Sequence, residues 1–159
     1  MNWDYVAGFF DGEGCMYIAF NRYTRNGKRC CNPHVQIIFT NTDKIALEAI
    51  ADFLHAHDVK CGLYCCHRNK IWKGAYNAKD LYSVRITSHE SMATFVNAIK
   101  SKIISKNEKM QTVEKALLYI QTARHGNREW TDDQKNEFEK RFIHTRKYTK
   151  NQYPTLKNA

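Results

Sequence analysis

Residues 6–14 read VAGFFDGEG, and this stretch decides how the rest of the chain is interpreted. The apolar residues 3–11 predict a short helix that Gly12-Glu13-Gly14 ends. Gly8 and Gly12 are four residues apart, so they share one helical face on which no side chain stands. A second helix backbone can approach such a face closely, by the steric logic of small-residue pairs in membrane helices.

The end of this helix is suited to a cation. A helix C-terminus presents free carbonyl groups and partial negative charge, and Glu13 adds a carboxylate. Oxygen ligands of this kind favour a hard divalent cation, usually Mg²⁺ where the substrate is a phosphate. If a second copy packed through the glycine face, two such acidic ends would lie side by side.

Strand and helix patterns follow. Residues 15–23 alternate with the period of a strand, Asn26-Gly27 predicts a hairpin, and residues 32–41 return as a second strand. A helix with Ile45 and Leu47 among its inward positions comes next, capped at residues 41–43. Two more strands are expected at about 61–68 and 80–87, then helices after Ser88, over 106–124, and after a capping box at Thr131.

These elements predict an α+β domain with one twisted antiparallel sheet. Helices must cover one face of the sheet, because it carries the apolar side chains of Met16, Ile18, Phe20, Val35, Ile37 and Phe39. The opposite face is rich in hydrogen-bonding groups and aromatic rings. It is either a solvated face or a surface for the major groove of DNA.

The charge favours the second interpretation. A net charge of +9 and a pI of about 9.3 indicate a polyanionic partner, most often nucleic acid. The residues assigned to DNA binding come from the polar sheet face and from basic turns: Tyr17, Asn21, Tyr23, Lys28, Arg29, Asn32, His34, Gln36, His67, Arg68, Lys70, Lys73, Ser83 and Arg85.

Composition excludes several classes of protein. The 159 residues suit one compact domain, and no apolar run approaches the ~20 residues that span a membrane. With no secretory signal visible, the six cysteines are expected to be reduced thiols, in an organelle with its own genome or a prokaryotic cytoplasm. Structural zinc is the alternative, although the His55-x-His57 pair has no CxxC partner.

VAGFFDGEG resembles the LAGLIDADG motif of homing endonucleases, in the variant that ends in Asp-Gly-Glu-Gly, and the element order over about residues 3–124 resembles the single-motif members. The resemblance implies an αββαββα fold with a saddle-shaped sheet over DNA, in an intron-encoded protein. It divides the chain into a core at 1–125 and a helical extension at 126–159. A single motif implies a homodimer, with an interface at Ala7, Gly8, Asp11 and Gly12.

The resemblance also implies roles for individual residues. The metal-binding acid falls on Glu13, and Gly12 offers its backbone carbonyl. The polar residue that ends the second strand and positions water falls on Asn41, with Asp43 as the rival if the register slips. The lysine that opens the helix after the second strand pair falls on Lys106.

Lys102 or Lys109 would substitute for this lysine in another register. An additional basic residue that the family sometimes has near the helix after the second strand is not supplied by Ile45 or Leu47.

The implied reaction is hydrolysis of both strands of duplex DNA, with two or more Mg²⁺ per dimer. From the strand lengths, the target is a pseudo-palindrome of roughly 18–20 base pairs. Two alternatives stay open on the same fold: an intron maturase that binds RNA, and a DNA-binding protein that does not cleave.

Overall fold

A computed structural model describes residues 1–25, 27–66, 79–123 and 130–143. The first seven of its elements follow the αββαββα order that the sequence predicts, and two helices come after them. Along the chain the elements are α1 (Trp3–Glu13), β1 (Gly14–Arg25), β2 (Lys28–Asn41), α2 (Lys44–His55), β3 (Gly62–Cys66), β4 (Leu81–Ile86), α4 (His89–Ile99), α5 (Asn107–Ala123) and α6 (Asp132–Phe142).

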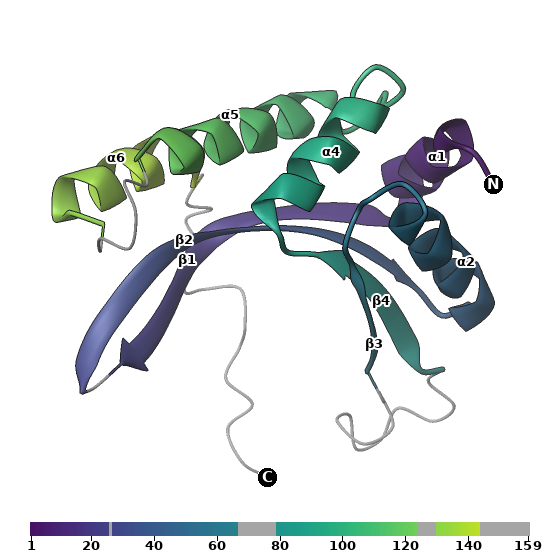
Figure 1. The fold of residues 1–159 in the computed structure, drawn as a ribbon, viewed down its shortest axis with the longest axis horizontal. Coiled ribbons are helices and arrows are strands. Elements are labelled where there is room, and N and C mark those ends of the chain that lie inside the picture. The colour runs from purple at the N-terminus through teal and green to yellow at the C-terminus, as the bar shows by residue number, and fades with distance from the viewer. Residues whose placement is uncertain (26, 67–78, 124–129, 144–159) are drawn as a thin grey trace, which may run out of the picture.

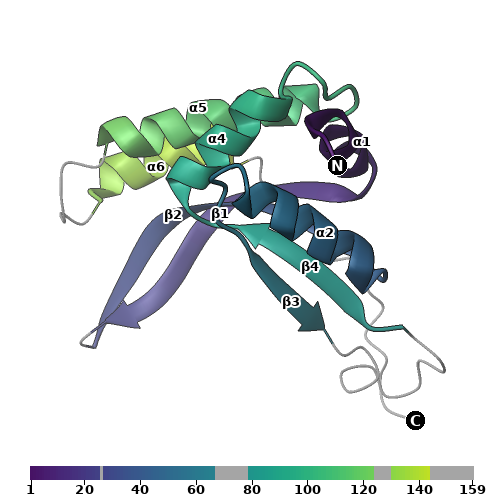
Figure 2. The ribbon, with the colours of Figure 1, turned by 45° about the vertical axis from the view of Figure 1, so that its right-hand side comes forward.

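The four strands form one antiparallel sheet in the order β1-β2-β4-β3. The sheet is arched, the helices lie over its convex face, and the concave face points away from them (Figures 1 and 2). The predicted α+β class and saddle shape are therefore confirmed.

The β1–β2 hairpin is longer than the alternation pattern indicated. Its ladder runs from the pair Gly14–Phe39 to the pair Arg25–Lys28. Gly27 lies in the two-residue connection with φ of 74°, a left-handed conformation that glycine adopts without strain. Hydrogen bonding thus extends the strands past the last apolar position, which is why sequence alternation underestimates their length.

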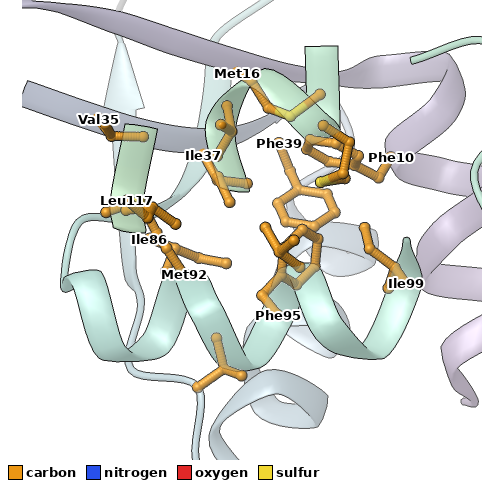
Figure 3. Close-up of a cluster of buried hydrophobic side chains, with 14 of the residues drawn as sticks. Phe10, Met16, Val35, Ile37, Phe39, Ile86, Met92, Phe95, Ile99 and Leu117 are labelled. Atoms are coloured by element: carbon orange, nitrogen blue, oxygen red, sulfur yellow. The ribbon is translucent and has the colours of Figure 1, made fainter. Parts of the chain in front are cut away.

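The core joins α1 to the sheet through three aromatic rings. Phe10 of α1, Phe39 of β2 and Phe95 of α4 meet edge to face, with ring centroids 5.1–5.6 Å apart (Figure 3). All three side chains are fully buried. Such pairs add about 0.5–1.5 kcal/mol each to the burial of their surfaces, so α1 is held firmly over the sheet.

The structure corrects two local expectations. The first helix ends at Glu13, two residues beyond the predicted end, because the N–H of Gly14 still donates to the carbonyl of Phe10. Ile45 is 77% exposed and does not face the core. It precedes the buried Leu47 by two residues, about 200° around the helix, so the two side chains point in nearly opposite directions.

The last helix packs on the same core. The predicted capping box at Thr131 is present, with Gln134 as its partner, and Phe138 and Phe142 on α6 are buried. The Phe138 ring lies 5.5 Å from that of Phe20 in β1. The boundary at 125/126 stays a prediction. None of the helices in the described segments is long and apolar enough to cross a membrane.

Candidate functional site at the end of helix α1

Helix α1 buries one face and leaves the opposite face open. Val6, Ala7 and Phe10 point into the core, whereas Gly8 and Gly12 are exposed. A Cβ atom added at either glycine would have no atom within 4 Å. The face expected to meet a partner is thus uncovered at its two glycines.

Ala7 does not belong to this face, because its side chain is 1% exposed within the single chain. It lies one position before Gly8 and three before Phe10, a spacing that places it with the core residues. This corrects its assignment to a dimer interface.

Asp11 makes contacts within its own chain. Its carboxylate accepts the backbone N–H groups of Ile104 (3.2 Å), Ser105 (3.0 Å) and Lys106 (3.1 Å), and its Oδ1 accepts the Ser105 hydroxyl at 2.7 Å. Asp11 therefore fixes the segment that enters α5 against the end of α1. Sequence reasoning did not find this contact within the chain, and the assignment of Asp11 to a dimer interface stays a prediction.

These hydrogen bonds lower the pKa of the Asp11 carboxyl from 3.8 to about 2. The backbone and side-chain hydrogen bonds from Ser105 are the largest causes, and the N–H groups of Ile104 and Lys106 add to them. A carboxylate that accepts several hydrogen bonds is stabilised in its charged form. Asp11 is therefore an anion at any neutral pH.

Lys106, the lysine that the resemblance assigns to the opening of the helix after the second strand pair, directly precedes α5, the second helix after β4. Its side chain reaches the C-terminal end of α1. Its ammonium donates to the carbonyl of Phe10 at 2.9 Å and to that of Asp11, and it lies 5.8 Å from the centre of the Phe10 ring. A positive charge is favourable beside the free carbonyls of a helix end. Lys102, the rival, instead pairs with Asp4.

Glu13 completes this end of the helix. It is the last residue of α1, its side chain is exposed, and it directly follows Gly12. The carbonyls of Phe10 and Asp11 already accept hydrogen bonds from Lys106, so those of Gly12 and Glu13 are the next along the helix end. A carboxylate beside backbone carbonyls is a donor set that a hard divalent cation accepts.

Asn41 ends β2, as predicted, and shapes the entry to α2. Gly14 pairs with Phe39, so Asn41 lies two residues beyond that pair, at the end of the sheet where α1 joins β1. Its Oδ1 accepts the N–H of Asp43 at 2.9 Å. Asp43 caps α2 through the N–H of Ala46, so the expected role of Asp43 as a helix cap is confirmed.

Lys44 is a basic residue that sequence reasoning missed. It opens α2 three residues after Asn41 and forms an ion pair with Glu48 at 2.9 Å, which raises its pKa. The Lys-xxx-Glu spacing was visible in the sequence. It supplies the positive charge near this helix that Ile45 and Leu47 do not.

The concave face carries the expected polar groups. In the β1–β2 ladder Tyr17 is opposite Gln36 and Asn21 is opposite Asn32, so these side chains share one face. His34 lies 6.4 Å from the Tyr17 ring. Ser83 is only 7% exposed and holds the side chain of Arg85. Of the remaining residues, Tyr23, Lys28 and Arg29 lie in the hairpin, and His67, Arg68, Lys70 and Lys73 lie outside the described residues.

The two histidines considered for zinc face different partners. Nε2 of His55 lies 3.0 Å from the carbonyl oxygen of Cys61, whereas Nδ1 of His57 lies 2.8 Å from that of Phe53. Burial raises the pKa of the Cys61 thiol to about 11. In the parts of the chain that the structure describes, no three His, Cys, Asp or Glu side chains gather as a metal cluster would.

Comparison with known proteins gives matches among solved structures only. No protein-family model matches the chain, and no curated protein matches it in sequence. The homing endonuclease I-TnaI superposes with a TM-score of 0.64 at 19% identity, over 88% of this chain and 84% of that one. I-CvuI, in complex with a DNA target in the presence of Mg, gives 0.52 at 15% identity, over 89% and 94%.

Longer proteins match as well. The LAGLIDADG meganuclease I-AabMI, bound to uncleaved DNA, gives a TM-score of 0.56 at 18% identity, and this chain covers 49% of its length. At such identities the likeness is one of fold. The chain has the fold of the LAGLIDADG homing endonucleases, as its motif at residues 6–14 predicts.

Proposed function

We propose that this chain is a site-specific DNA endonuclease that acts as a homodimer and uses a divalent metal ion, Mg²⁺ by preference. The observation that carries the proposal is the arrangement at the end of α1. The exposed carboxylate of Glu13 lies two residues from a carbonyl that binds the Lys106 ammonium. The acid and the lysine are thus both at the C-terminal end of α1, in a fold whose solved examples include homing endonucleases bound to DNA.

The homodimer rests on the open face of α1. Gly8 and Gly12 leave the helix backbone bare, and Tyr5, at helical spacing from Gly8, is exposed beside them. A symmetric partner presents the same face in return. Packing through the glycines brings two Glu13 carboxylates together, one for each DNA strand.

The donor set fits a divalent cation held by the Glu13 carboxylate and the Gly12 carbonyl. Mg²⁺ bound there would supply Lewis-acid activation of water and stabilise the charge on the phosphate. The protein's own share is placement and charge. Lys106 presents a fixed positive charge to the developing negative charge, and the amide of Asn41 orients water.

The concave sheet face is the proposed DNA surface. It points away from the helices (Figure 2). The strand register places Tyr17, Asn21, His34 and Gln36 on this face. Strands with this mixture of donors, acceptors and rings suit the edges of bases in the major groove. The net charge of +9 supports affinity for the phosphate backbone.

One cleavage experiment tests the proposal. The full chain, Glu13→Gln and the control Glu139→Gln, an exposed acid on α6, are incubated with a library of duplex DNA with and without Mg²⁺. Binding of the full chain to duplex DNA and to folded RNA is measured in parallel. Metal-dependent double-strand breaks by the wild type and Glu139→Gln, but not by Glu13→Gln, are expected. Tight DNA binding with no breaks by any of them would favour the non-cleaving DNA-binding protein. A preference for folded RNA over duplex DNA would favour the maturase.

A further inference from the structure

Two residues on the concave face, Ser83 and Tyr64, hold Arg85 in a fixed orientation. Nε of Arg85 in β4 donates to Oγ of Ser83 at 3.1 Å. The guanidinium carbon of Arg85 lies 4.7 Å from the centre of the Tyr64 ring in β3. The arginine is therefore anchored at one nitrogen and covered on one side by an aromatic ring.

The backbone register explains how Tyr64 reaches Arg85. Tyr64 is opposite Ser83 in the β3–β4 ladder, and Gly62 is opposite Arg85. A Cβ atom at Gly62 would lie 2.9 Å from the Tyr64 ring. Because position 62 has no side chain, the ring can occupy the space across from Arg85.

This arrangement orients Arg85 before any ligand binds. Ser83 is buried, whereas Tyr64 is 50% exposed on the concave face. The hydrogen bond and the ring contact reduce the number of rotamers that Arg85 can adopt. An arginine ordered in advance loses less entropy on binding than a mobile one.

The N–H groups on the two terminal nitrogens of Arg85 match the acceptors of one base. The bond to Ser83 uses the Nε–H alone, so it does not involve the four N–H groups of the two terminal nitrogens. That end-on fork matches the two acceptors O6 and N7 that guanine presents in the major groove. A phosphate is the other acceptor of this shape. Arg85, however, lies in β4, an inner strand between β2 and β3. In the proposed complex an inner strand of the concave face lies over the base edges, so a base is the acceptor that we assign to it.

We propose that Arg85 reads a guanine in each half of the DNA target, with Tyr64 and Ser83 as the residues that position it. This inference rests on the proposed function, because it requires DNA on the concave face. It assigns a base and a readout geometry to one residue of that face, and it adds Tyr64, which the sequence did not single out.

The register also places this guanine within the site. Arg85 is opposite Ile38, and Ile38 is opposite Cys15, which follows Glu13 by two residues. The footprint runs along the strands, so Arg85 lies at the same level along it as Cys15, at the end of the sheet next to Glu13. The guanine therefore lies in the inner part of each half-site. Asn21, six residues further along β1, is ~20 Å away from Cys15 and serves as a matched control.

Selection of binding sites from a pool of random duplex DNA, without divalent metal, tests this assignment. The wild type is expected to select guanine at one inner position of each half-site. Arg85→Ala should lose that preference, by about 5- to 150-fold in relative affinity, and keep the others. Arg85→Lys should weaken it, because lysine lacks the planar fork that stacks on the Tyr64 ring. Tyr64→Ala and Ser83→Ala should partly weaken the preference for guanine, whereas Tyr64→Phe keeps the ring and should retain that preference. Asn21→Ala should change the preferred bases only at the outer positions of each half-site.

Other outcomes would overturn the inference. If Arg85→Ala weakens binding equally on all sequences and reduces the slope of log affinity against log salt concentration by about one, Arg85 contacts a phosphate. If Tyr64→Ala and Ser83→Ala select the wild-type sequence with wild-type strength, the positioning role is wrong. If the wild type selects no duplex DNA, the proposed function itself fails, which is a separate result. Arg85→Lys keeps the positive charge, so it serves as the second variant if Arg85→Ala does not fold.

Discussion

The carboxylate of Asp11 accepts the backbone N–H of Lys106 at 3.1 Å, and the ammonium of Lys106 donates back to the carbonyl of Asp11. The two residues are 95 positions apart in the sequence. Their reciprocal contact joins the last turn of α1 to the segment that begins α5. It also places the Lys106 ammonium at the carbonyl of Asp11. Asp11 directly precedes Gly12 and Glu13, the two residues proposed to hold the metal.

Replacement of Asp11 by Asn should make stability less dependent on acid pH. The folded-state pKa of about 2 lies below the ordinary value of 3.8, so ionised Asp11 stabilises the fold above pH ~4. That contribution is lost as pH falls from about 4 toward 2. We expect urea unfolding at pH 7 to give the wild type a larger free energy of unfolding than Asp11→Asn. This difference should become smaller as the pH falls from about 4 toward 2.

Asp4→Asn is the matched control for this prediction. Asp4 lies on the same helix and pairs with Lys102, but its side chain is 70% exposed. Exposed ion pairs contribute little, so the control should stay close to the wild type. A gap between wild type and Asp11→Asn that is the same at pH 2.5 and at pH 7 would contradict the assigned role of the carboxylate.

Replacement of Lys106 by Met should impair cleavage far more than DNA binding. Loss of one positive charge at the site of developing negative charge typically lowers the rate by about 10²–10³-fold. Single-turnover cleavage and binding to the same duplex measure the two effects separately. Lys102→Met is the control, because Lys102 pairs with Asp4. Equal loss of cleavage in both variants would show that the lysine is misassigned.

Patterns within short segments predicted most of the fold, because strand alternation and helix caps depend on residues close together in the sequence. Alternation identified the buried side of the sheet at Met16 and Ile37, and side-chain caps marked the helix starts at Asp43 and Thr131. The error at Ile45 came from counting an apolar residue as inward by type. Its position relative to Leu47 already placed it on the other side of the helix.

The missed parts of the site depend on contacts between distant segments. Asp11 binds residues more than 90 positions away, and no local signal indicates that pairing. Tyr64 joins the candidate DNA surface only through the β3–β4 register, which a single sequence does not specify. Ala7 is different, since its spacing from Phe10 was visible in the motif and would have assigned it to the core.

A side chain added at Gly8 should change the stability of the subunit and its self-association in opposite directions. A Cβ at this position meets nothing within 4 Å in the single chain. Alanine inside a helix is favoured over glycine by roughly 0.5–1 kcal/mol, because glycine loses more conformational freedom on folding. In a dimer packed through the glycines, however, the added methyl groups of both subunits would meet at the closest approach of the helices.

Gly8→Ala should therefore stabilise the separate subunit and weaken its self-association, and Gly8→Leu should prevent association. Sedimentation equilibrium measures association, and thermal unfolding at low protein concentration measures the subunit. Ala49→Leu, on the exposed side of α2, adds comparable bulk away from α1 and should leave association unchanged. A Gly8→Leu protein that still sediments as a dimer would place the interface elsewhere and remove the reason for pairing two Glu13 carboxylates.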